Sequence, residues 1–192
     1  MGTNDSTGAH NAVAKRVSLT PQGAVFNGTS SSITTSDPVL NTAAGGSFTV
    51  AAWVYLTNTK HYATAVSQDG TTNSGFYLQY SSADKRWAFA RVVHDTAGSP
   101  GIRALSSGAP VTNRWTHLAG VYNAMNGQLS LYVDGTLQRT AKDTTPFFAG
   151  GHLAIGRALF SSKQTDWFPG RIKDVEAFDQ ALTSAQVAAL KP

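Results

Sequence analysis

The chain contains the stretch Ser47-Phe-Thr-Val-Ala-Ala-Trp-Val-Tyr55, in which apolar residues recur at every second position. On an extended strand one face would carry the core-forming side chains, which are Phe48, Val50, Ala52 and Val54. Trp53 and Tyr55 would point to the opposite face. Because a strand with apolar residues on both faces is covered on both sides, this stretch predicts a central strand of a β-sheet.

Further segments with an extended pattern follow along the chain, separated by turn signals. They cover residues 23–28, 62–66, 75–80, 86–93, 115–122, 129–133, 153–156 and 170–178. Asp134-Gly135 closes one hairpin, since this dipeptide readily supplies the positive φ values of a tight turn. Short strands at such intervals in 192 residues predict an all-β fold, a two-sheet antiparallel β-sandwich. It would form a single domain over residues 1–192, with a polar N-terminal segment at residues 1–22.

One helix is expected near the C-terminus, over residues 183–190. Thr183 is a suitable N-cap, and Gln186 stands three residues later, which is the spacing of a capping box. The apolar stripe of this helix would consist of Leu182, Ala185, Val187 and Leu190. The expected fold is therefore a β-sandwich with one short C-terminal helix.

The composition restricts the classes of function. Charged residues form only 14% of the chain, and its net charge of +4 comes from scattered basic residues. Nucleic-acid-binding proteins concentrate Lys and Arg in a patch, so no nucleic-acid partner is expected. The absence of cysteine excludes disulfides and Cys-ligated zinc. No apolar run approaches the ~20 residues that span a membrane, and the polar start lacks the apolar segment of a signal peptide.

Seven segments, taken in order, carry a family resemblance. They are Ala24-Val-Phe-Asn-Gly28, Ser47-Phe-Thr-Val-Ala-Ala-Trp-Val54, Trp115-Thr-His-Leu-Ala-Gly-Val-Tyr122, Leu129-Ser-Leu-Tyr-Val-Asp-Gly135, Ile155-Gly-Arg157, Gly170-Arg-Ile-Lys-Asp-Val-Glu-Ala-Phe178 and Gln180-Ala-Leu-Thr-Ser-Ala-Gln-Val-Ala-Ala-Leu190. Their succession resembles the bacterial type of laminin G-like jelly-roll domain, in the concanavalin A-like lectin/glucanase superfamily. The resemblance implies two antiparallel sheets packed face to face, with the first and last strands close together.

The resemblance implies a function in binding. The expected molecule is a non-catalytic carbohydrate-binding module of a larger secreted, extracellular protein, with a glycan as partner and further domains attached. The alternative is a protein-interaction or adhesion domain without a sugar site, whose partner is an extracellular protein. Exposed Trp and Tyr beside Asp, Asn or Arg would favour the first function, and a broad apolar patch without a groove would favour the second.

A structural calcium ion is also implied by the resemblance. Asp174, in the last predicted strand, resembles the acidic residue often used for calcium in this family. Asn27 and Gly28, after the first strand, would add oxygen ligands, although many relatives have Asp where Asn27 stands. Calcium needs about six to eight oxygen ligands. The alternative is that Asp174 makes ordinary hydrogen bonds to the N-terminal segment.

Catalysis is not expected, although glucanases share the fold that the resemblance implies. Asp174 and Glu176 stand two apart on a predicted strand, so their carboxylates would face the same way. The laminarinase-like enzymes of this fold use Glu-x-Asp-x-Glu on one strand, and Ile172 occupies the first of these positions here. Glu176 is the only glutamate in the chain. The pair of carboxylates that glycoside hydrolysis uses is therefore incomplete in this motif.

Aromatic and polar side chains outside the core are the candidates for ligand binding, because the C–H faces of sugars stack on aromatic rings. Trp167 stands in a polar loop at 161–170, where the alternative role is a loop anchor. The other candidates, from the strands and loops earlier in the chain, are Tyr62, Tyr77, Tyr80, Arg91 and His94, with Arg103 nearby in sequence. Trp53 and Trp115 belong to strong strand segments and are expected to be structural.

Overall fold

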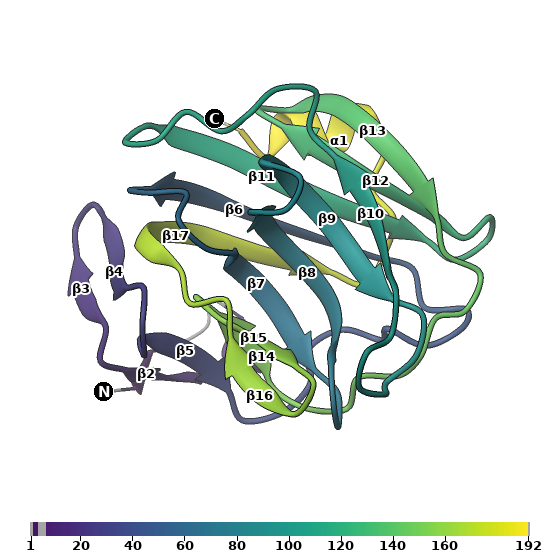
Figure 1. Cartoon of the computed structure of the whole chain (residues 1–192), viewed down its shortest axis with the longest axis horizontal. Coiled ribbons are helices and arrows are strands. Elements are labelled where there is room, and N and C mark those ends of the chain that lie inside the picture. Colours follow the sequence, from purple (N-terminus) through teal and green to yellow (C-terminus); the bar gives the residue numbers. More distant parts are fainter. Residues whose placement is uncertain (1, 4–6, 192) are drawn as a thin grey trace.

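A computed structural model describes residues 2–3 and 7–191 and shows two antiparallel sheets packed face to face (Figure 1). Sheet A has eight strands in the order β1-β2-β5-β14-β7-β8-β9-β10, and sheet B has seven strands in the order β13-β12-β11-β6-β17-β4-β3. A separate hairpin, β15-β16, and the helix α1 complete the described elements. The predicted two-sheet sandwich with one short C-terminal helix is confirmed.

The bounds of these elements agree closely with most of the predicted segments. Sheet A consists of β1 (Gly2–Thr3), β2 (Ala12–Lys15), β5 (Ser32–Thr35), β14 (Leu153–Ile155), β7 (Ala63–Asp69), β8 (Ser74–Ser81), β9 (Arg86–Val92) and β10 (Gly101–Leu105). Sheet B consists of β13 (Thr136–Lys142), β12 (Gln128–Val133), β11 (Trp115–Asn123), β6 (Phe48–Leu56), β17 (Pro169–Phe178), β4 (Gly23–Asn27) and β3 (Ser18–Thr20). The remaining elements are β15 (Ala158–Phe160), β16 (Lys163–Thr165) and α1 (Ser184–Ala189).

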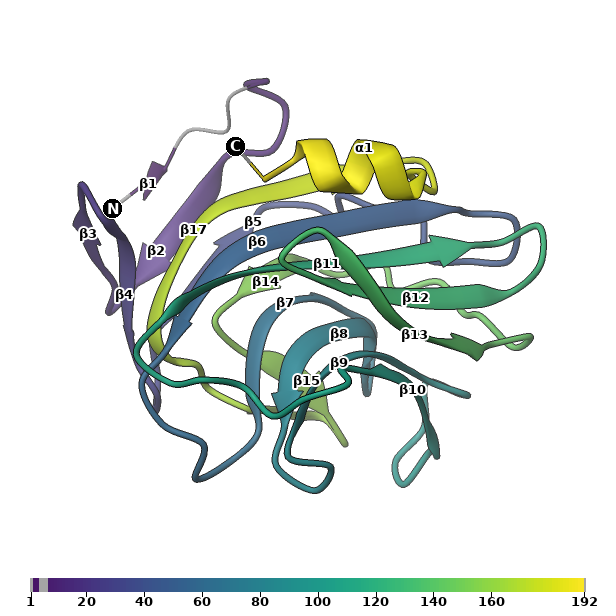
Figure 2. The same cartoon turned by 90° about the horizontal axis from the view of Figure 1, so that it is seen from above.

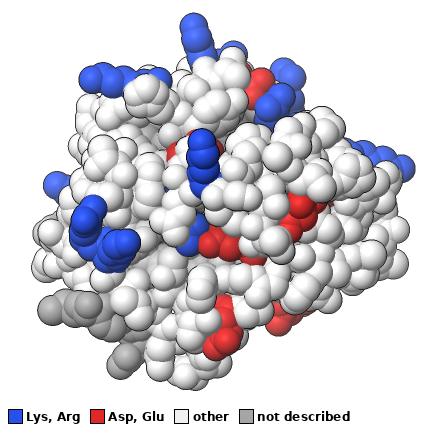
Figure 3. Space-filling view, turned by 60° about the horizontal axis from the view of Figure 1, so that its bottom comes forward, with Lys and Arg blue, Asp and Glu red and all other residues white. Residues whose placement is uncertain are grey.

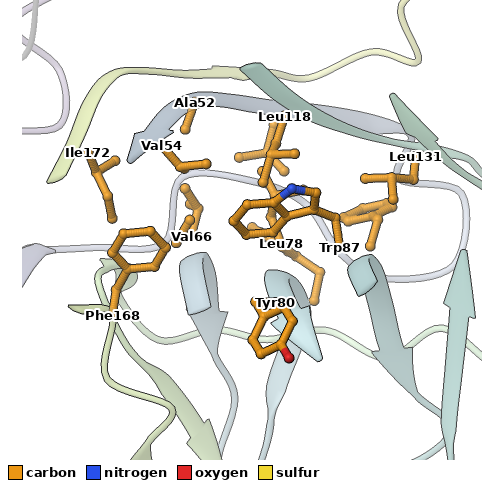
Figure 4. Packing of buried hydrophobic residues seen from close by; sticks show 14 of the residues in the cluster. Ala52, Val54, Val66, Leu78, Tyr80, Trp87, Leu118, Leu131, Phe168 and Ile172 are labelled. Atoms are coloured by element: carbon orange, nitrogen blue, oxygen red, sulfur yellow. The ribbon is translucent and has the colours of Figure 1, made fainter. Parts of the chain in front are cut away.

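Strand β6 is central in sheet B, between β11 and β17, as its two apolar faces predict. Its core-facing side chains pack against sheet A across the sandwich. Figure 4 shows Ala52 and Val54 on one side of the core and Val66 and Leu78 on the other, with the indole of Trp87 between the sheets. All of these side chains are buried. The core therefore lies between the two sheets.

Helix α1 lies on the outer face of sheet B and covers one half of it (Figure 2). The Gln186 backbone N–H donates to the Thr183 hydroxyl group (3.3 Å), and the Thr183 backbone N–H donates to the Gln186 side chain (2.8 Å). The predicted capping box is thus confirmed. Val187 is buried against Ala51 and Ala119 of sheet B, which explains why so short a helix is stable in this position.

A buried guanidinium group closes one end of the sandwich. Arg91 on β9 points into the core, where its Nε donates to the Gly75 carbonyl (2.9 Å) and its Nη2 to the Thr42 carbonyl (2.6 Å). The carboxylate of Asp143, equally buried, lies 3.3 Å from Nε, and the guanidinium carbon lies 4.7 Å from the centre of the Tyr122 ring. A charge at this depth is tolerated only when it is paired and hydrogen-bonded. Arg91 therefore fixes β9 to the loops at this end.

The packing of the core predicts a specific effect at Gly120 on β11. A Cβ atom at this position would collide with the ring of Phe89. We expect Gly120→Ala to lower the free energy of unfolding by about 1–3 kcal/mol, because the well-packed core must shift to admit the methyl group. Gly108→Ala is the matched control, since a Cβ there meets no atom within 4 Å. Chemical denaturation measures both variants, and equal stabilities would contradict the described packing.

Candidate functional site

A pocket of about 420 Å³ opens on the outer face of sheet A. Alternate residues of β8 and β9 point away from the core and form its floor. In register across the sheet stand Tyr77 on β8, Ala90 on β9 and Arg103 on β10. Because the alanine in the middle is small, space remains between the phenol ring on one side and the guanidinium group on the other. The pocket is thus a product of sheet register and of one small side chain.

The hairpin β15-β16 forms one wall of the pocket and is pinned to sheet A. The Tyr77 hydroxyl donates to the Leu159 carbonyl (3.0 Å) and accepts from the Ser74 backbone N–H (3.0 Å). The Leu159 N–H in turn donates to the Ser74 hydroxyl (2.9 Å). Burial raises the pKa of Tyr77, so its hydroxyl group stays protonated and remains a donor. The ring of Phe160, at the end of β15, lines the same wall.

Asp166, directly after β16, places a carboxylate at this wall. Its backbone adopts the left-handed region (φ 54°), and its carbonyl accepts a hydrogen bond from the Thr64 N–H of β7 (2.8 Å). The carboxylate accepts from the Thr165 hydroxyl group (3.2 Å). Desolvation raises the pKa of Asp166, while the Thr165 hydrogen bond opposes that shift. A strained, partly desolvated carboxylate facing a pocket is a feature typical of functional sites.

Two further polar groups border the pocket. The side chain of Arg103 is 39% exposed at the rim, and its Nε lies 3.4 Å from a carboxylate oxygen of Asp84. Gln79, beside Tyr77 on the same face of β8, accepts a hydrogen bond from the Thr64 hydroxyl group through Oε1 (3.0 Å). The pocket therefore combines aromatic walls with the carboxylate of Asp166, the guanidinium group of Arg103 and the amide of Gln79. Strands or the hairpin β15-β16 hold each of them.

Two of the predicted ligand residues lie in this pocket. Tyr62, just before β7, and Tyr77 both line it. Trp167 is half-buried directly beside Asp166 but is not among the lining residues. The loop that was expected to present a tryptophan thus contributes its aspartate instead.

Three predicted ligand residues lie elsewhere. Tyr80 is buried in the core and makes an edge contact with Trp87, because an interval of three positions puts it on the opposite face from Tyr77. Arg91 borders the pocket through strand β9, but its guanidinium group points into the core, as described above. His94 is exposed in the loop between β9 and β10, outside the pocket lining.

The outer face of sheet B, beyond α1, carries a second group of aromatic residues. Tyr55 and Trp115 stand in register, with ring centres 5.6 Å apart, and Trp53 is the next outward residue of β6. Lys173 and Arg171 of β17 lie over these rings, with the Lys173 nitrogen 5.5 Å from the Trp115 ring centre. The rings are half-buried beneath these cations, and the structural role of both tryptophans stays a prediction.

The three predicted calcium ligands do not lie together. Asn27 on β4 stands opposite Pro169, five positions before Asp174 on β17, which corresponds to roughly 15 Å along the strand. The Asn27 side-chain oxygen already accepts hydrogen bonds from the backbone N–H groups of Thr29 (2.9 Å), Ser30 (2.9 Å) and Ser31 (3.1 Å). A calcium site built jointly from Asn27, Gly28 and Asp174 therefore does not fit this geometry.

Asp174 lies at an irregularity of β17. Its φ is 48°, and the register of β17 with β6 shifts between Lys173 and Glu176, so the expected simple alternation is broken there. Asp174 and Glu176 both line an open pocket of about 860 Å³ beside the N-terminal segment, and the Lys173 ammonium group lies 3.2 Å from the Asp174 carboxylate. Desolvation, followed by the charge of Asp174, raises the pKa of Glu176. Across residues 7–191, no group of three or more His, Asp or Glu side chains is placed to hold a metal ion. Calcium binding at Asp174 stays a prediction.

The surface agrees with the charge distribution read from the sequence. On the face shown in Figure 3, the Lys and Arg residues form separate groups divided by uncharged surface. A continuous basic patch is thus not seen among the described residues of this face. No described helix has the length and apolar character needed to cross a membrane.

The fold and its motifs agree with a known family. The laminin G family model, described as the concanavalin A-like lectin/glucanases superfamily, matches residues 27–188. The chain therefore belongs to this superfamily, as its sequence segments predict. Among curated proteins, none matches the chain in sequence.

Several solved structures are similar to the whole chain. Domain 4 of AbnA, a GH43 extracellular arabinanase from Geobacillus stearothermophilus in complex with arabinotriose, is 22% identical (TM-score 0.75), covering 98% of this chain and 92% of that one. The binding domain of botulinum neurotoxin DC in complex with SialylT is 14% identical (TM-score 0.70), covering 99% and 49%. Trypanosoma rangeli sialidase is 16% identical (TM-score 0.69), covering 99% of this chain and 30% of the sialidase. At these identities the similarity shows the fold.

The hydrogen bonds of Asn27 predict a structural role. We expect Asn27→Ala to lower the free energy of unfolding by about 1–2 kcal/mol, since three backbone N–H groups of the following loop lose their acceptor. The loss should be the same in EDTA and in millimolar calcium when measured by thermal unfolding. Asn58→Ala is the control, because among the described residues Asn58 accepts a single hydrogen bond, from the Lys60 N–H (3.2 Å). A loss seen only with calcium would make Asn27 a metal ligand.

The same measurement tests Asp174. If Asp174 holds calcium, EDTA lowers the melting temperature of the wild type and Asp174→Ala removes that response. An identical melting curve with EDTA and with millimolar calcium would contradict calcium binding.

Proposed function

We propose that this domain is a non-catalytic carbohydrate-binding module of a larger secreted protein, and that it binds its glycan in the pocket over Ala90. The observation that carries the proposal is the composition of this pocket. Tyr62 and Phe160 supply ring surface above the buried Tyr77, while Asp166 and Arg103 supply an acceptor and a donor. Small-ligand sites combine apolar walls with a few convergent polar groups in this way.

The proposal also draws support from the rigidity of the site. The wall is fixed by the Tyr77 and Ser74 hydrogen bonds to Leu159, and the floor is fixed by the pairing of β8, β9 and β10. A site that is already formed loses little conformational entropy when the ligand binds. Among the similar structures, the arabinanase domain is in complex with arabinotriose and the toxin domain is in complex with SialylT, which supports a sugar ligand for this fold.

The alternative function is a protein-interaction or adhesion domain without a sugar site. Exposed apolar side chains on the described surface are Val13, Leu19, Val111, Met125, Leu137, Phe148 and Phe160. They come from several different strands and loops, and only Phe160 lies at the pocket. A contiguous apolar patch would mark a protein-binding surface, and the pocket, with a single one of these residues at its wall, is not such a patch.

The function is tested by filling the pocket. On a glycan array the wild-type domain should bind a defined set of sugars, and Ala90→Trp should reduce the affinity for them more than about tenfold, because the indole occupies the floor. Ala109→Trp, at an exposed position away from the pocket, is the matched control. Ala90→Leu narrows the same floor with a smaller side chain. It replaces Ala90→Trp in the test if the indole lowers the melting temperature. Binding that is unchanged in both Ala90 variants would place the site elsewhere, and no binding to any glycan would favour adhesion.

A further inference from the structure

The pocket has a closed end and an open end. The hairpin β15-β16 lies against β7 and β8 and is pinned there by the Tyr77 and Ser74 hydrogen bonds. At the other end the floor reaches β10, the edge strand of sheet A, where the exposed Arg103 stands. A volume of about 420 Å³ is near the lower end of the usual range for small-ligand pockets. A glycan chain bound in this pocket would enter from the β10 side and end against the hairpin.

At the closed end, the carboxylate of Asp166 can accept more hydrogen bonds than it receives. An ionised carboxylate offers about four lone-pair positions. Within residues 7–191, the Asp166 carboxylate has one hydrogen-bond donor, the Thr165 hydroxyl group at 3.2 Å. Two neighbouring hydroxyl groups of a sugar ring are suitably spaced to donate hydrogen bonds to the free lone pairs of this carboxylate. Hydrogen bonds to an ionised carboxylate are stronger than those to a neutral acceptor, so such donors would favour binding.

The charges at the closed end are unfavourable for an acidic sugar. The charges of Asp166 and Asp95 both act on Tyr77, which places two carboxylates around this end of the pocket. Asp95 is held in place by hydrogen bonds from the backbone N–H groups of Thr71, Thr72 and Asn73. The one guanidinium group of the lining that faces the pocket, that of Arg103, lies at the opposite end and is already paired with Asp84. A ligand carboxylate at the closed end would thus face like charge.

We propose that the pocket selects the end of a neutral glycan, whose terminal unit donates two adjacent hydroxyl groups to Asp166, and that it excludes a terminal uronate. This selection rests on the proposed function, because it assigns chemistry to the same pocket. Asp166 acts here as the specificity-determining residue, Ala90 supplies the space, and Tyr62 and Phe160 supply the ring surface.

The experiment compares matched probes by isothermal titration calorimetry. The neutral probes are disaccharides that end in galactose or glucose, and the acidic probes are their counterparts that end in galacturonate or glucuronate, which replace one CH2OH group by a carboxylate. The wild-type domain should bind one neutral probe at least about tenfold more tightly than its acidic counterpart. Asp166→Asn should weaken the binding of the neutral probe by about tenfold. It should also bring the ratio of the dissociation constants of the acidic and neutral probes close to one. Asp179→Asn, an exposed and distant carboxylate, should change neither value.

The possible failures are distinguishable. If a uronate probe binds as tightly as its neutral counterpart and Ala90→Trp abolishes both, the domain binds glycans in this pocket but the selection for neutral ends is wrong. If Asp166→Asn leaves the preference unchanged while its melting temperature equals that of the wild type, Asp166 is not the selecting group. If none of these probes binds while the array shows another ligand whose binding Ala90→Trp abolishes, the function stands and the selection for these neutral ends is wrong. If no glycan on the array binds, or if Ala90→Trp leaves binding intact, the proposed function fails and the selection fails with it.

Discussion

The guanidinium group of Arg91 lies in the core of a β-sandwich, and the arrangement around it sets the geometry of the pocket. Strand residues alternate between the two faces of a sheet. Because Arg91 is fixed inside by Gly75, Thr42 and Asp143, its neighbour Ala90 must face outward, where it forms the floor of the pocket. The buried charge of Arg91, held by two carbonyl groups and by Asp143, thus determines which residues of β9 face the pocket on the other side of the strand.

The two faces of the sandwich have different roles. The outer face of sheet B is covered by α1 at one half and by cations over aromatic rings at the other, so its apolar side chains already have partners. Among the described residues, the hairpin β15-β16 and Phe147 cover part of the outer face of sheet A. The space between that hairpin and the edge strand β10 remains open. This difference between the faces is the reason why the proposed binding site is assigned to sheet A.

Much of the fold was predictable from the sequence because alternation and turn chemistry act locally. The central strand 48–56, the hairpin at Asp134 and the capping box of Thr183 are all local patterns. The site was less predictable, since it depends on register between distant strands. Alternation from Tyr77 would have indicated Gln79 on the same face, but no local signal marks Asp166, whose position depends on the hairpin. Strand β10 was missed because Gly101 and Arg103 interrupt its apolar pattern at an edge.

The calcium and ligand residues that were misplaced share one cause. Asn27 and Asp174 belong to paired strands, yet the register puts them at distant points, and sequence order does not reveal register. Tyr80 and Arg91 were grouped with Tyr77 by proximity in the chain, whereas the pleat sends them to the core. Side-chain direction, rather than residue type, thus decided which candidates reach the surface.

A crystal structure of the domain with the glycan that it binds most tightly tests the central claim most directly. The account predicts that the terminal sugar unit lies over Ala90, between Tyr77 and Arg103, with its hydroxyl groups at the Asp166 carboxylate. A glycan bound instead over Trp53 and Trp115 on the outer face of sheet B would contradict it.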